Sequence, residues 1–506
     1  MRLFVVPAVA GLTLAALTAV TSPASATADG CDGSTVVDFN GDGRPDAAVG
    51  DPSGAVGALD GAGHVIVRYG GTGGHIGNAS SVRLTQSDVG STSQAQARFG
   101  NALAAADQDC DGYTDLLVGV PGYDLAGGKT NAGMAVLIKG SSSGLGNGGG
   151  TATYTTASFG QATASGDAFG FSVDMIEDVG TGGTPDPFAY AFAIGAPYRD
   201  AGGQIDSGAV AFRNAGDGGN VGGWLTQDSA GFPGASEQGD AFGYSVALLY
   251  DGDDRTDLVV GSPGEDVVAG GGDVVDAGVI TRIHHLYLDE YDSVESFSQN
   301  SSGVPDTVEA GDRFGHSLAG SRSGSTNYLA VGVPLENVGS KSDAGLVQLF
   351  TVAGSTITPK TGLTQNTSGV AGSAETNDHF GDVVDLALAT NTYLAVGVPG
   401  ENQEATNSGL VQVFKAASVS TDKSYTQDSS GVGGKAATND AFGSSVALVS
   451  GYSEHALLVG VPSDNAYPNG LVHAIPYRGG SAIHQTWKGL AAGAADFGVS
   501  LATQGS

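Results

Sequence analysis

The chain has 506 residues, of which 84 are glycine, and its formal net charge is −33 at pH 7. Glycine is far above its usual share of about 7 %, and long helix-period segments are missing, so we expect an all-β protein with tight turns. The negative charge argues against nucleic acid and anionic membranes as partners, because phosphates would be repelled.

The first 26 residues have the pattern of a secretory signal peptide. Arg2 precedes an apolar stretch from Leu3 to about Val20, and small residues follow up to an A-x-A ending at residues 24–26. A membrane anchor is the alternative, but the apolar run barely reaches spanning length. We therefore expect a signal peptide at residues 1–26 and a secreted, extracellular mature chain without a membrane span.

Three short motifs recur seven times each, in a fixed cyclic order. The first is Phe-Gly before a β-type stretch, at Phe99, Phe169, Phe242, Phe314, Phe380, Phe442 and Phe497. The second is an apolar run that closes on Gly-x-Pro, at Gly50, Gly119, Gly195, Gly261, Gly332, Gly397 and Gly460. The third, a small residue and a glycine leading into a β run (AGHVIV, AGMAVL and so on), follows each Gly-x-Pro. Each period thus holds about four short strands, the content of a propeller blade.

The two ends of the repeat series predict a closed ring. Gly50 has no Phe-Gly motif before it, and Phe497 has no Gly-x-Pro motif after it. One blade is therefore split, with its Phe-Gly strand near the C-terminus and its other strands near the N-terminus. We expect residues 27–506 to form a single seven-bladed β-propeller of four-stranded antiparallel blades, closed by pairing of these parts.

With these motifs, residues 31–506 resemble the FG-GAP repeat family, the seven-bladed propeller of integrin α-subunits, in a secreted, bacterial-type form. The resemblance implies loops of the form D-x-[DN]-x-D-G-x-x-D between the Phe-Gly strand and the Gly-x-Pro strand, which bind calcium on one face. Partner recognition is then expected on the other face. Members of the family serve adhesion or act as binding modules attached to enzymes.

Two loops match every position of this calcium pattern. The first offers Asp38, Asn40, Asp42, Asp46 and the carbonyl of Arg44; the second offers Asp107, Asp109, Asp111, Asp115 and the carbonyl of Tyr113. Calcium prefers six to eight oxygen ligands, and clustered carboxylates repel one another without a cation. A metal-free turn is the alternative, since Asp, Asn and Gly favour turns. A third, weaker match in blade 4 offers Asp251, Asp253 and Asp257, but Asp254 replaces its glycine.

The chain has two cysteines, Cys31 and Cys110. In an oxidising compartment they predict one disulfide, with two free thiols as the alternative. GHSLA at residues 315–319 imitates a nucleophile elbow, but the same slot reads GYSVA and GSSVA in other blades, so Ser317 is interpreted as a strand residue. His284 and His285 are adjacent, yet the sequence indicates no compact zinc set of histidines and carboxylates.

Two functions remain open at this level. The first is a calcium-stabilised adhesion module that binds an extracellular protein or glycan, as a monomer and without catalytic residues. The second is an extracellular hydrolase or lyase that uses the propeller funnel, with carbohydrate as the candidate substrate. A funnel lined by convergent acids with perturbed pKa values would favour the enzyme, whereas a flat face with exposed aromatic residues would favour binding.

Overall fold

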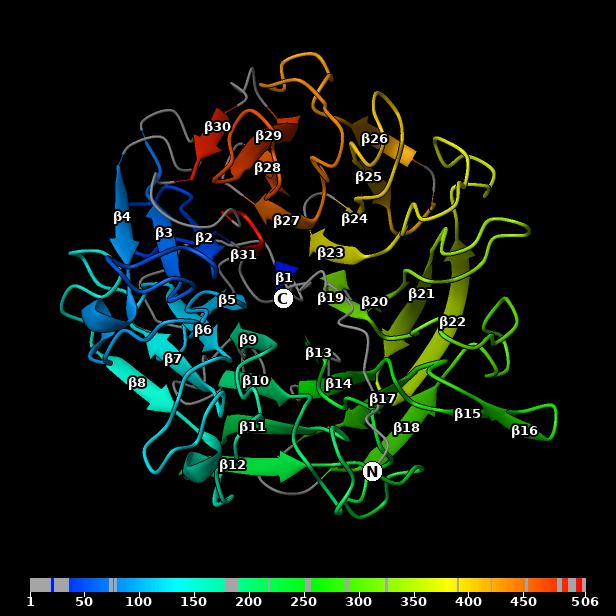
Figure 1. The fold of residues 1–506 in the computed structure, drawn as a ribbon, viewed down its shortest axis with the longest axis horizontal. Coiled ribbons are helices and arrows are strands. Elements are labelled where there is room, and N and C mark those ends of the chain that lie inside the picture. Colours follow the sequence, from blue (N-terminus) through cyan, green and yellow to red (C-terminus); the bar gives the residue numbers. More distant parts are fainter. Residues whose placement is uncertain are drawn as a thin grey trace, which may run out of the picture.

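The computed structural model describes residues 20–21, 36–71, 76, 80–177, 190–216, 219–250, 256–286, 291–323, 326–388, 391–419, 421–450, 454–479, 485–489 and 497–502. They form seven four-stranded antiparallel blades around a central axis (Figure 1), which confirms the predicted fold class. Helical structure in these ranges is limited to the 3-10 helices η1 (Gln86–Val89) and η2 (Thr156–Phe159). No helix in the described part could cross a membrane.

The strands of each blade run in order from the axis to the rim. Blade 1 comprises β31 (Ser500–Ala502), β2 (Ala47–Asp51), β3 (His64–Arg68) and β4 (Ser81–Leu84). Blade 2 comprises β5 (Leu103–Ala106), β6 (Asp115–Val120), β7 (Met134–Ile138) and β8 (Thr151–Tyr154). Blade 3 comprises β9 (Val173–Glu177), β10 (Tyr190–Ala196), β11 (Ala209–Gly216) and β12 (Gly219–Leu225). Blade 4 comprises β13 (Ser245–Tyr250), β14 (Thr256–Ser262), β17 (Val279–His284) and β18 (Ser293–Phe297).

The other three blades follow the same plan. Blade 5 comprises β19 (Ser317–Ser323), β20 (Thr326–Val333), β21 (Leu346–Ala353) and β22 (Thr356–Leu363). Blade 6 comprises β23 (Val383–Leu388), β24 (Thr392–Val398), β25 (Leu410–Lys415) and β26 (Thr421–Tyr425). Blade 7 comprises β27 (Ser445–Ser450), β28 (Glu454–Val461), β29 (Leu471–Gly479) and β30 (Gln485–Lys488). An additional hairpin, β15 (Val267–Ala269) and β16 (Gly272–Val274), projects from blade 4 (Figure 1).

Strand β1 (Val20–Thr21) pairs in parallel with β23, where Val20 lies opposite Leu386. It belongs to the segment predicted as a signal peptide, and the remainder of residues 1–26 lies outside the described residues. The signal peptide and the secreted location therefore stay predictions.

The predicted closure of the ring is confirmed. Strand β31 pairs antiparallel with β2, so that Ser500 lies opposite Gly50 and Ala502 lies opposite Ala48. The backbone N–H of Gly498 also donates to the carbonyl of Gly50 at 3.0 Å. Residues separated by about 450 positions thus complete one blade, and no free sheet edge is left at the seam.

The hydrophobic core lies between neighbouring blades. One cluster joins Val65 and Val67 of blade 1 to Val118 and Val136 of blade 2, and the corresponding clusters continue around the ring. Both faces of a blade are covered, so the inner strands are continuous apolar runs rather than alternating ones. This explains why the sequence shows short apolar runs without a clear period of two.

The repeated motifs meet where two blades touch. The seven phenylalanines of the Phe-Gly pairs are all fully buried. The glycine that follows each of them has a positive φ near 90°, for example 89° at Gly100 and 94° at Gly443, a region that side chains rarely adopt. Its carbonyl lies against the Gly-x-Pro glycine of the preceding blade: a Cβ built on Gly119 would stand 2.0 Å from the oxygen of Gly170.

A serine stands three residues after several of these phenylalanines, and its hydroxyl donates a hydrogen bond to the Phe-Gly glycine carbonyl of the next blade. The hydroxyl of Ser172 donates to the carbonyl of Gly243 at 2.8 Å, and that of Ser245 donates to Gly315 at 2.7 Å. Ser317 is the equivalent residue of blade 5, and its hydroxyl donates to the carbonyl of Gly381 at 3.0 Å. The interpretation of Ser317 as a repeat position rather than a nucleophile is therefore supported by its own contact.

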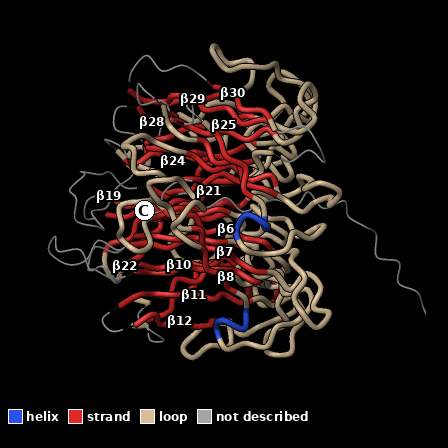
Figure 2. Tube along the Cα trace, turned by 90° about the vertical axis from the view of Figure 1, so that its left-hand side faces the viewer, coloured by secondary structure: helices blue, strands red, loops and turns tan. Residues whose placement is uncertain are grey.

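The antiparallel order of the strands gives the propeller two different faces. The turns that join first to second strands, which include both predicted calcium loops, lie on one face. The connections after each Gly-x-Pro, together with η1 and η2, lie on the other, and Figure 2 shows them along one side of the molecule. We call these the hairpin face and the connection face.

Candidate functional site

The first predicted calcium loop leads directly into β2, the second strand of the split blade. Its Asp38 accepts backbone hydrogen bonds from Gly43 at 2.7 Å and Asp42 at 3.1 Å, while Asn40 accepts one from Asp42 at 3.0 Å. These contacts hold the oxygen-bearing side chains on the inside of the loop. Arg44, of which only the carbonyl was predicted as a ligand, directs its guanidinium to Asp42 at 3.4 Å.

The second loop lies between β5 and β6 and repeats this pattern. Asp107 accepts from Gly112 at 2.8 Å and Asp111 at 3.2 Å, and Asp111 accepts from the N–H of Tyr113 at 3.0 Å. One carboxylate oxygen each from Asp107, Asp109 and Asp115 lie within 4.8 Å of one another. The structure thus brings together three of the residues that the sequence predicted as ligands.

The second loop also contains a cation that sequence reasoning missed. The ammonium of Lys139, just after β7, lies 3.0 Å from a carboxylate oxygen of Asp109 and 3.0 Å from one of Asp115. Tyr69 holds the equivalent place after β3 in blade 1. The signal was available in the sequence, because both residues stand directly before the glycine that follows the third strand, Gly140 or Gly70.

The last aspartate of each calcium pattern is buried beneath its loop. Asp46 and Asp115 are at most 1 % exposed, and each accepts a backbone hydrogen bond from the glycine after the third strand, at 2.7 Å from Gly70 and 2.8 Å from Gly140. Burial raises the pKa of Asp46 to about 8, against the hydrogen bond from Gly70. Burial also raises the pKa of Asp115 to about 7, against the charge of Lys139 and the hydrogen bond from Gly140. Neither carboxylate is fully compensated, and Asp46 has no Lys139 equivalent beside it.

The donor sets therefore fit a hard cation such as calcium. All ligand candidates are oxygen atoms, as calcium prefers, and burial disfavours their charged forms unless a positive charge is supplied. In the first loop Asp38, Asn40, Asp42, Asp46 and the Arg44 carbonyl would hold the ion. In the second loop Asp107, Asp109, Asp111, Asp115 and the Tyr113 carbonyl would hold it, in competition with Lys139.

The weaker third match looks different. Asp251 and Asp253 lie outside the described residues. Asp257 is fully buried and contacts the guanidinium of Arg282, whose Nε donates to it at 2.7 Å. Its other oxygen lies 2.8 Å from Nδ1 of His284 and accepts the N–H of His285 at 2.9 Å. Asp257 is the blade 4 equivalent of Asp46 and Asp115, and the guanidinium of Arg282 provides the positive charge beside it.

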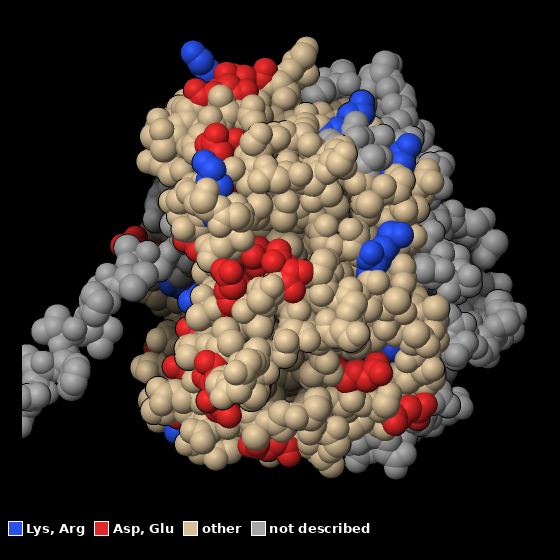
Figure 3. Space-filling model, turned by 90° about the vertical axis from the view of Figure 1, so that its right-hand side faces the viewer, with Lys and Arg blue, Asp and Glu red and all other residues tan. Residues whose placement is uncertain are grey.

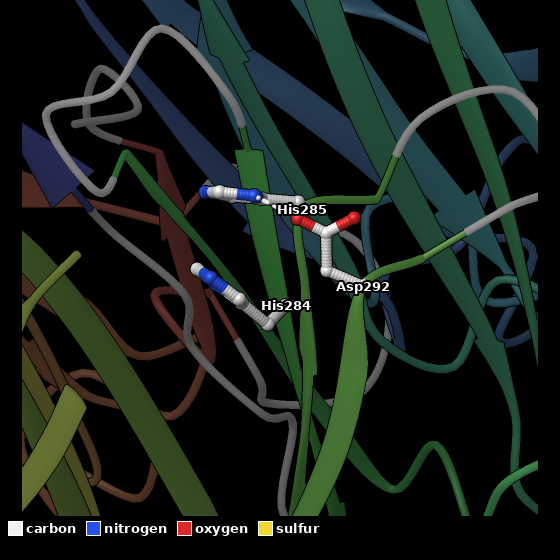
Figure 4. A group of neighbouring side chains, drawn as sticks. All are labelled: His284, His285 and Asp292. Carbon is white, nitrogen blue, oxygen red and sulfur yellow. Dashed lines mark hydrogen bonds and ion pairs between the residues drawn. The ribbon is translucent and has the colours of Figure 1, made fainter. Parts of the chain in front are cut away.

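Figure 4 shows the histidine pair beside this network together with Asp292. The two imidazole rings lie 3.6 Å apart between centroids, and Nδ1 of His285 is 2.7 Å from a carboxylate oxygen of Asp292. One ligand atom from each of His284, His285 and Asp292 lie within 4.8 Å of one another. The expectation that the chain has no compact set of histidines and carboxylates is therefore wrong. It failed because Asp292 reaches His285 only through the pairing of β17 with β18.

The first two predicted calcium loops contact each other. The N–H of Thr114 donates to the carbonyl of Asp38 at 3.0 Å, and the hydroxyl of Thr114 accepts the N–H of Asp38 at 2.9 Å. Cys110, within the second loop, is disulfide-bonded, and the other predicted partner, Cys31, lies outside the described residues. Two hydrogen bonds therefore connect the two predicted loops directly.

The connection face carries the apolar side chains that sequence reasoning did not single out. The exposed large hydrophobic residues of the described chain all lie in the connections after Gly-x-Pro of blades 3 and 4: Tyr198, Ile205, Val268 and Val275. Val268, on the projecting hairpin, is 71 % exposed. Tyr198 also packs edge-on against Phe171, with ring centroids 5.6 Å apart.

Near the axis on this face, one side chain per blade stands two residues after the phenylalanine of the Phe-Gly pair. Neighbours in this ring touch: Phe171 and Tyr244 have centroids 5.0 Å apart, as have Tyr244 and His316. The ring contains a single carboxylate, Asp382, among Asn101, Phe171, Tyr244, His316, Asp382, Ser444 and Val499. Burial raises the pKa of Asp382 to about 7 and lowers the pKa of His316 to about 3.

Comparisons with known proteins agree with this architecture. Residues 99–138 match the FG-GAP repeat family. Phosphatidylinositol-glycan-specific phospholipase D of Rattus norvegicus is 39 % identical over 94 residues, which are 19 % of this chain and 10 % of that protein. Integrin alpha-IIb of Homo sapiens is 33 % identical over 171 residues, which are 32 % of this chain and 15 % of the integrin. The chain thus spans a small part of these relatives, and its resemblance to FG-GAP, integrin α-like propellers is confirmed.

Two solved structures also match most of the chain. The β-propeller domain of Myceliophteria thermophila Cps50 (Swd1) has a TM-score of 0.41 at 11 % identity, covering 86 % of this chain and 95 % of the domain. Sqt1 of Saccharomyces cerevisiae has a TM-score of 0.38 at 11 % identity, covering 85 % and 80 %. Likenesses of this size carry no functional assignment.

Proposed function

We propose that the chain is a secreted, calcium-binding propeller that acts as an adhesion module and binds an extracellular protein or glycan through its connection face. The observation that carries the proposal is the location of Tyr198, Ile205, Val268 and Val275. These exposed hydrophobic side chains gather on the connections of two adjacent blades, and apolar groups gathered on a surface are typical of binding sites. The likeness to a segment of integrin alpha-IIb supports a protein partner.

Calcium has a structural part in this proposal. It would bind the two loops of the hairpin face, neutralise their carboxylates and fix the split blade beside blade 2. Because Asp38 and Thr114 are hydrogen-bonded to each other, an ion in either loop would also order its neighbour. The ion would take no direct part in partner recognition, which would use the opposite face.

The enzyme hypothesis has less support. Glycoside hydrolysis by the usual mechanism needs two carboxylates on either side of the scissile bond. The axial ring of seven residues offers one, Asp382. Two other members of the ring, Tyr244 and His316, pack against each other. The likeness to the phospholipase covers 19 % of this chain, so it adds no site residue to the hypothesis.

Binding to an array of extracellular matrix proteins and glycans, in calcium and in chelator, tests the function. Partners found in this way are then measured with Val268→Asp and Val275→Asp, for which we expect at least a tenfold loss of affinity. The matched control is Thr356→Asp, which adds the same charge at an exposed position on the hairpin face and leaves affinity unchanged. Equal losses in all three variants, or turnover of a polysaccharide without binding, would contradict the proposal.

The metal is tested separately by equilibrium dialysis with calcium and by thermal unfolding. We expect Asp109→Asn to lower the number of bound ions, and chelation to lower the melting temperature of the wild-type chain. A melting temperature that is the same in calcium and in chelator would show that the loops are metal-free turns.

A further inference from the structure

Three positions, polar in most blades, recur on the connection face where one blade is joined to the next. A glutamine or threonine follows the outer strand, an aspartate or alanine stands two residues before the phenylalanine of Phe-Gly, and a third polar residue stands two residues after the proline of Gly-x-Pro. Between blades 4 and 5 these are Gln299, Asp312 and Glu336, which we call cluster A. Between blades 5 and 6 they are Gln365, Asp378 and Glu401, which we call cluster B.

Cluster A places two acids in the protein interior. Asp312, Glu336 and Gln299 are at most 2 % exposed. Oδ2 of Asp312 accepts a backbone hydrogen bond from Glu309 at 2.6 Å, and Nε2 of Gln299 donates to Oε2 of Glu336. Burial raises the pKa of Asp312 to about 7 and that of Glu336 to about 8, and the charge of Asp312 is the next cause at Glu336.

In each cluster, one oxygen of the aspartate and the oxygen of the glutamine have no hydrogen-bond donor. Oδ1 of Asp312 and Oε1 of Gln299 make no hydrogen bond, and in cluster B the same holds for Oδ1 of Asp378 and Oε1 of Gln365. Asp378 and Gln365 are also at most 2 % exposed. Buried acceptors are almost always paired, so the same two unpaired oxygens in two successive clusters leave a place for one further donor or cation in each.

Blade 3 shows the arrangement with its cation included. There the three positions are Thr156, Asp167 and Arg199, so a guanidinium replaces the glutamate of cluster A. Nη1 of Arg199 lies 2.8 Å from Oδ2 of Asp167. In blade 3, therefore, a positively charged side chain lies beside the aspartate of this arrangement.

Blade 2 shows the arrangement without acids. Its positions are Gln86, Ala97 and Tyr123. Gln86 is fully satisfied by backbone, since Nε2 donates to the carbonyl of Ala62 at 2.9 Å and Oε1 accepts the N–H of Gln94 at 2.8 Å. The glutamine is left without a donor only in blades where acids surround it.

Blade 7 explains why the aspartate is orphaned in clusters A and B. Its Asp440 is satisfied, because the backbone N–H and the amide of Asn465 donate to Oδ1 at 3.0 and 2.9 Å. The equivalent asparagine of cluster A, Asn337, donates instead to Glu309 at 2.7 Å. An additional exposed acid thus draws the asparagine away and leaves Oδ1 of Asp312 facing the cluster.

We propose that clusters A and B each bind a calcium ion on the connection face, in addition to the loops of the hairpin face. The available metal-ligand atoms are carboxylate and amide oxygens, which suit calcium rather than zinc or copper. Cluster A is the better equipped, because Asp306, with φ +86°, stands where cluster B has Gly372, and its charge acts on both Asp312 and Glu336. Figure 3 shows compact patches of Asp and Glu on the side of the molecule that carries these blades.

The test counts calcium ions per chain, by equilibrium dialysis and native mass spectrometry, in the full-length protein. Glu336→Arg copies the arginine of blade 3, so its guanidinium takes the place of the ion. We expect the loss of one calcium per chain and a melting temperature in chelator above that of the wild-type chain. Glu336→Gln, which keeps the side-chain shape, also loses one calcium, so a folding failure of the arginine variant does not decide the result.

Two controls separate this site from the hairpin face. Asp273→Asn removes an exposed carboxylate from β16 and leaves the calcium count unchanged. Asp109→Asn lowers the count through the second loop whether or not cluster A binds an ion. A full calcium count in both Glu336 variants overturns the proposal, and it would mean that protons rather than ions neutralise the cluster.

Discussion

Gly460 of blade 7 lies so close to Gly498 of blade 1 that a Cβ built on Gly460 would stand 2.0 Å from the Gly498 carbonyl oxygen. The same carbonyl accepts the hydroxyl of Ser445. This is the last of seven equivalent contacts around the ring, and it joins blade 7 to the C-terminal strand of the split blade. Its consequence is that the ring closes through a backbone contact that only glycine permits.

Substitution of this glycine should open the seam. We expect Gly460→Ala to destabilise the propeller by about 3 kcal/mol or more, because the added carbon meets a backbone atom and cannot be relieved by a rotamer change. Urea unfolding measures the effect. Gly272→Ala is the control, since nothing lies within 4 Å of its Cβ position and its φ is not positive, and it should change stability by less than about 0.5 kcal/mol.

Ser317 should behave as a structural residue. Because its hydroxyl donates to the buried carbonyl of Gly381, Ser317→Ala leaves an acceptor unpaired and should cost about 1–3 kcal/mol in the free energy of unfolding. A serine-reactive organophosphorus probe should label the wild-type chain and the variant equally. Labelling that disappears with Ser317 would contradict the assignment.

Lys139 should weaken calcium binding in the second loop. Its ammonium lies 3.0 Å from both Asp109 and Asp115, so an incoming ion must displace a positive charge. We expect Lys139→Met to tighten calcium binding by about tenfold or more, which corresponds to about 1.4 kcal/mol. Calorimetric titration measures the change.

The first loop provides the comparison, because Tyr69 stands at the equivalent position and carries no charge. Of the two loops, the first should therefore have the higher affinity in the wild-type chain. If Lys139→Met has the same calcium affinity as the wild-type chain, the displacement of Lys139 from the second loop costs no free energy.

Asp382 should make stability depend on pH. Burial raises its pKa from 3.8 to about 7, so the folded chain holds this proton more tightly than the unfolded chain does. Stability from this residue is full below about pH 4 and falls as the pH rises to about 7, by up to about 4 kcal/mol. Asp382→Asn should remove this fall, which urea unfolding at pH 5 and pH 8, at one fixed calcium concentration, can measure.

Much of the architecture could be predicted because each repeated motif corresponds to one steric requirement of the fold. Phe-Gly marks a buried ring beside a glycine with positive φ, and Gly-x-Pro marks the glycine that the next blade's carbonyl touches. The unmatched ends at Gly50 and Phe497 then required the split blade. The oxygen-rich loops at Asp38 and Asp107 were visible for the same reason, since their spacing is local.

The sequence by itself determined the ring, the seam and the two oxygen-rich loops for which calcium is predicted, because all of these follow from short-range patterns. Only the tertiary structure decided which charges meet across strands and blades. It placed Lys139 among the acids of the second loop, put Arg282 beside Asp257, brought Asp292 to His285, and left Oδ1 of Asp312 without a hydrogen-bond donor. These contacts depend on strand pairing and on neighbouring blades, and no local spacing in the chain encodes them.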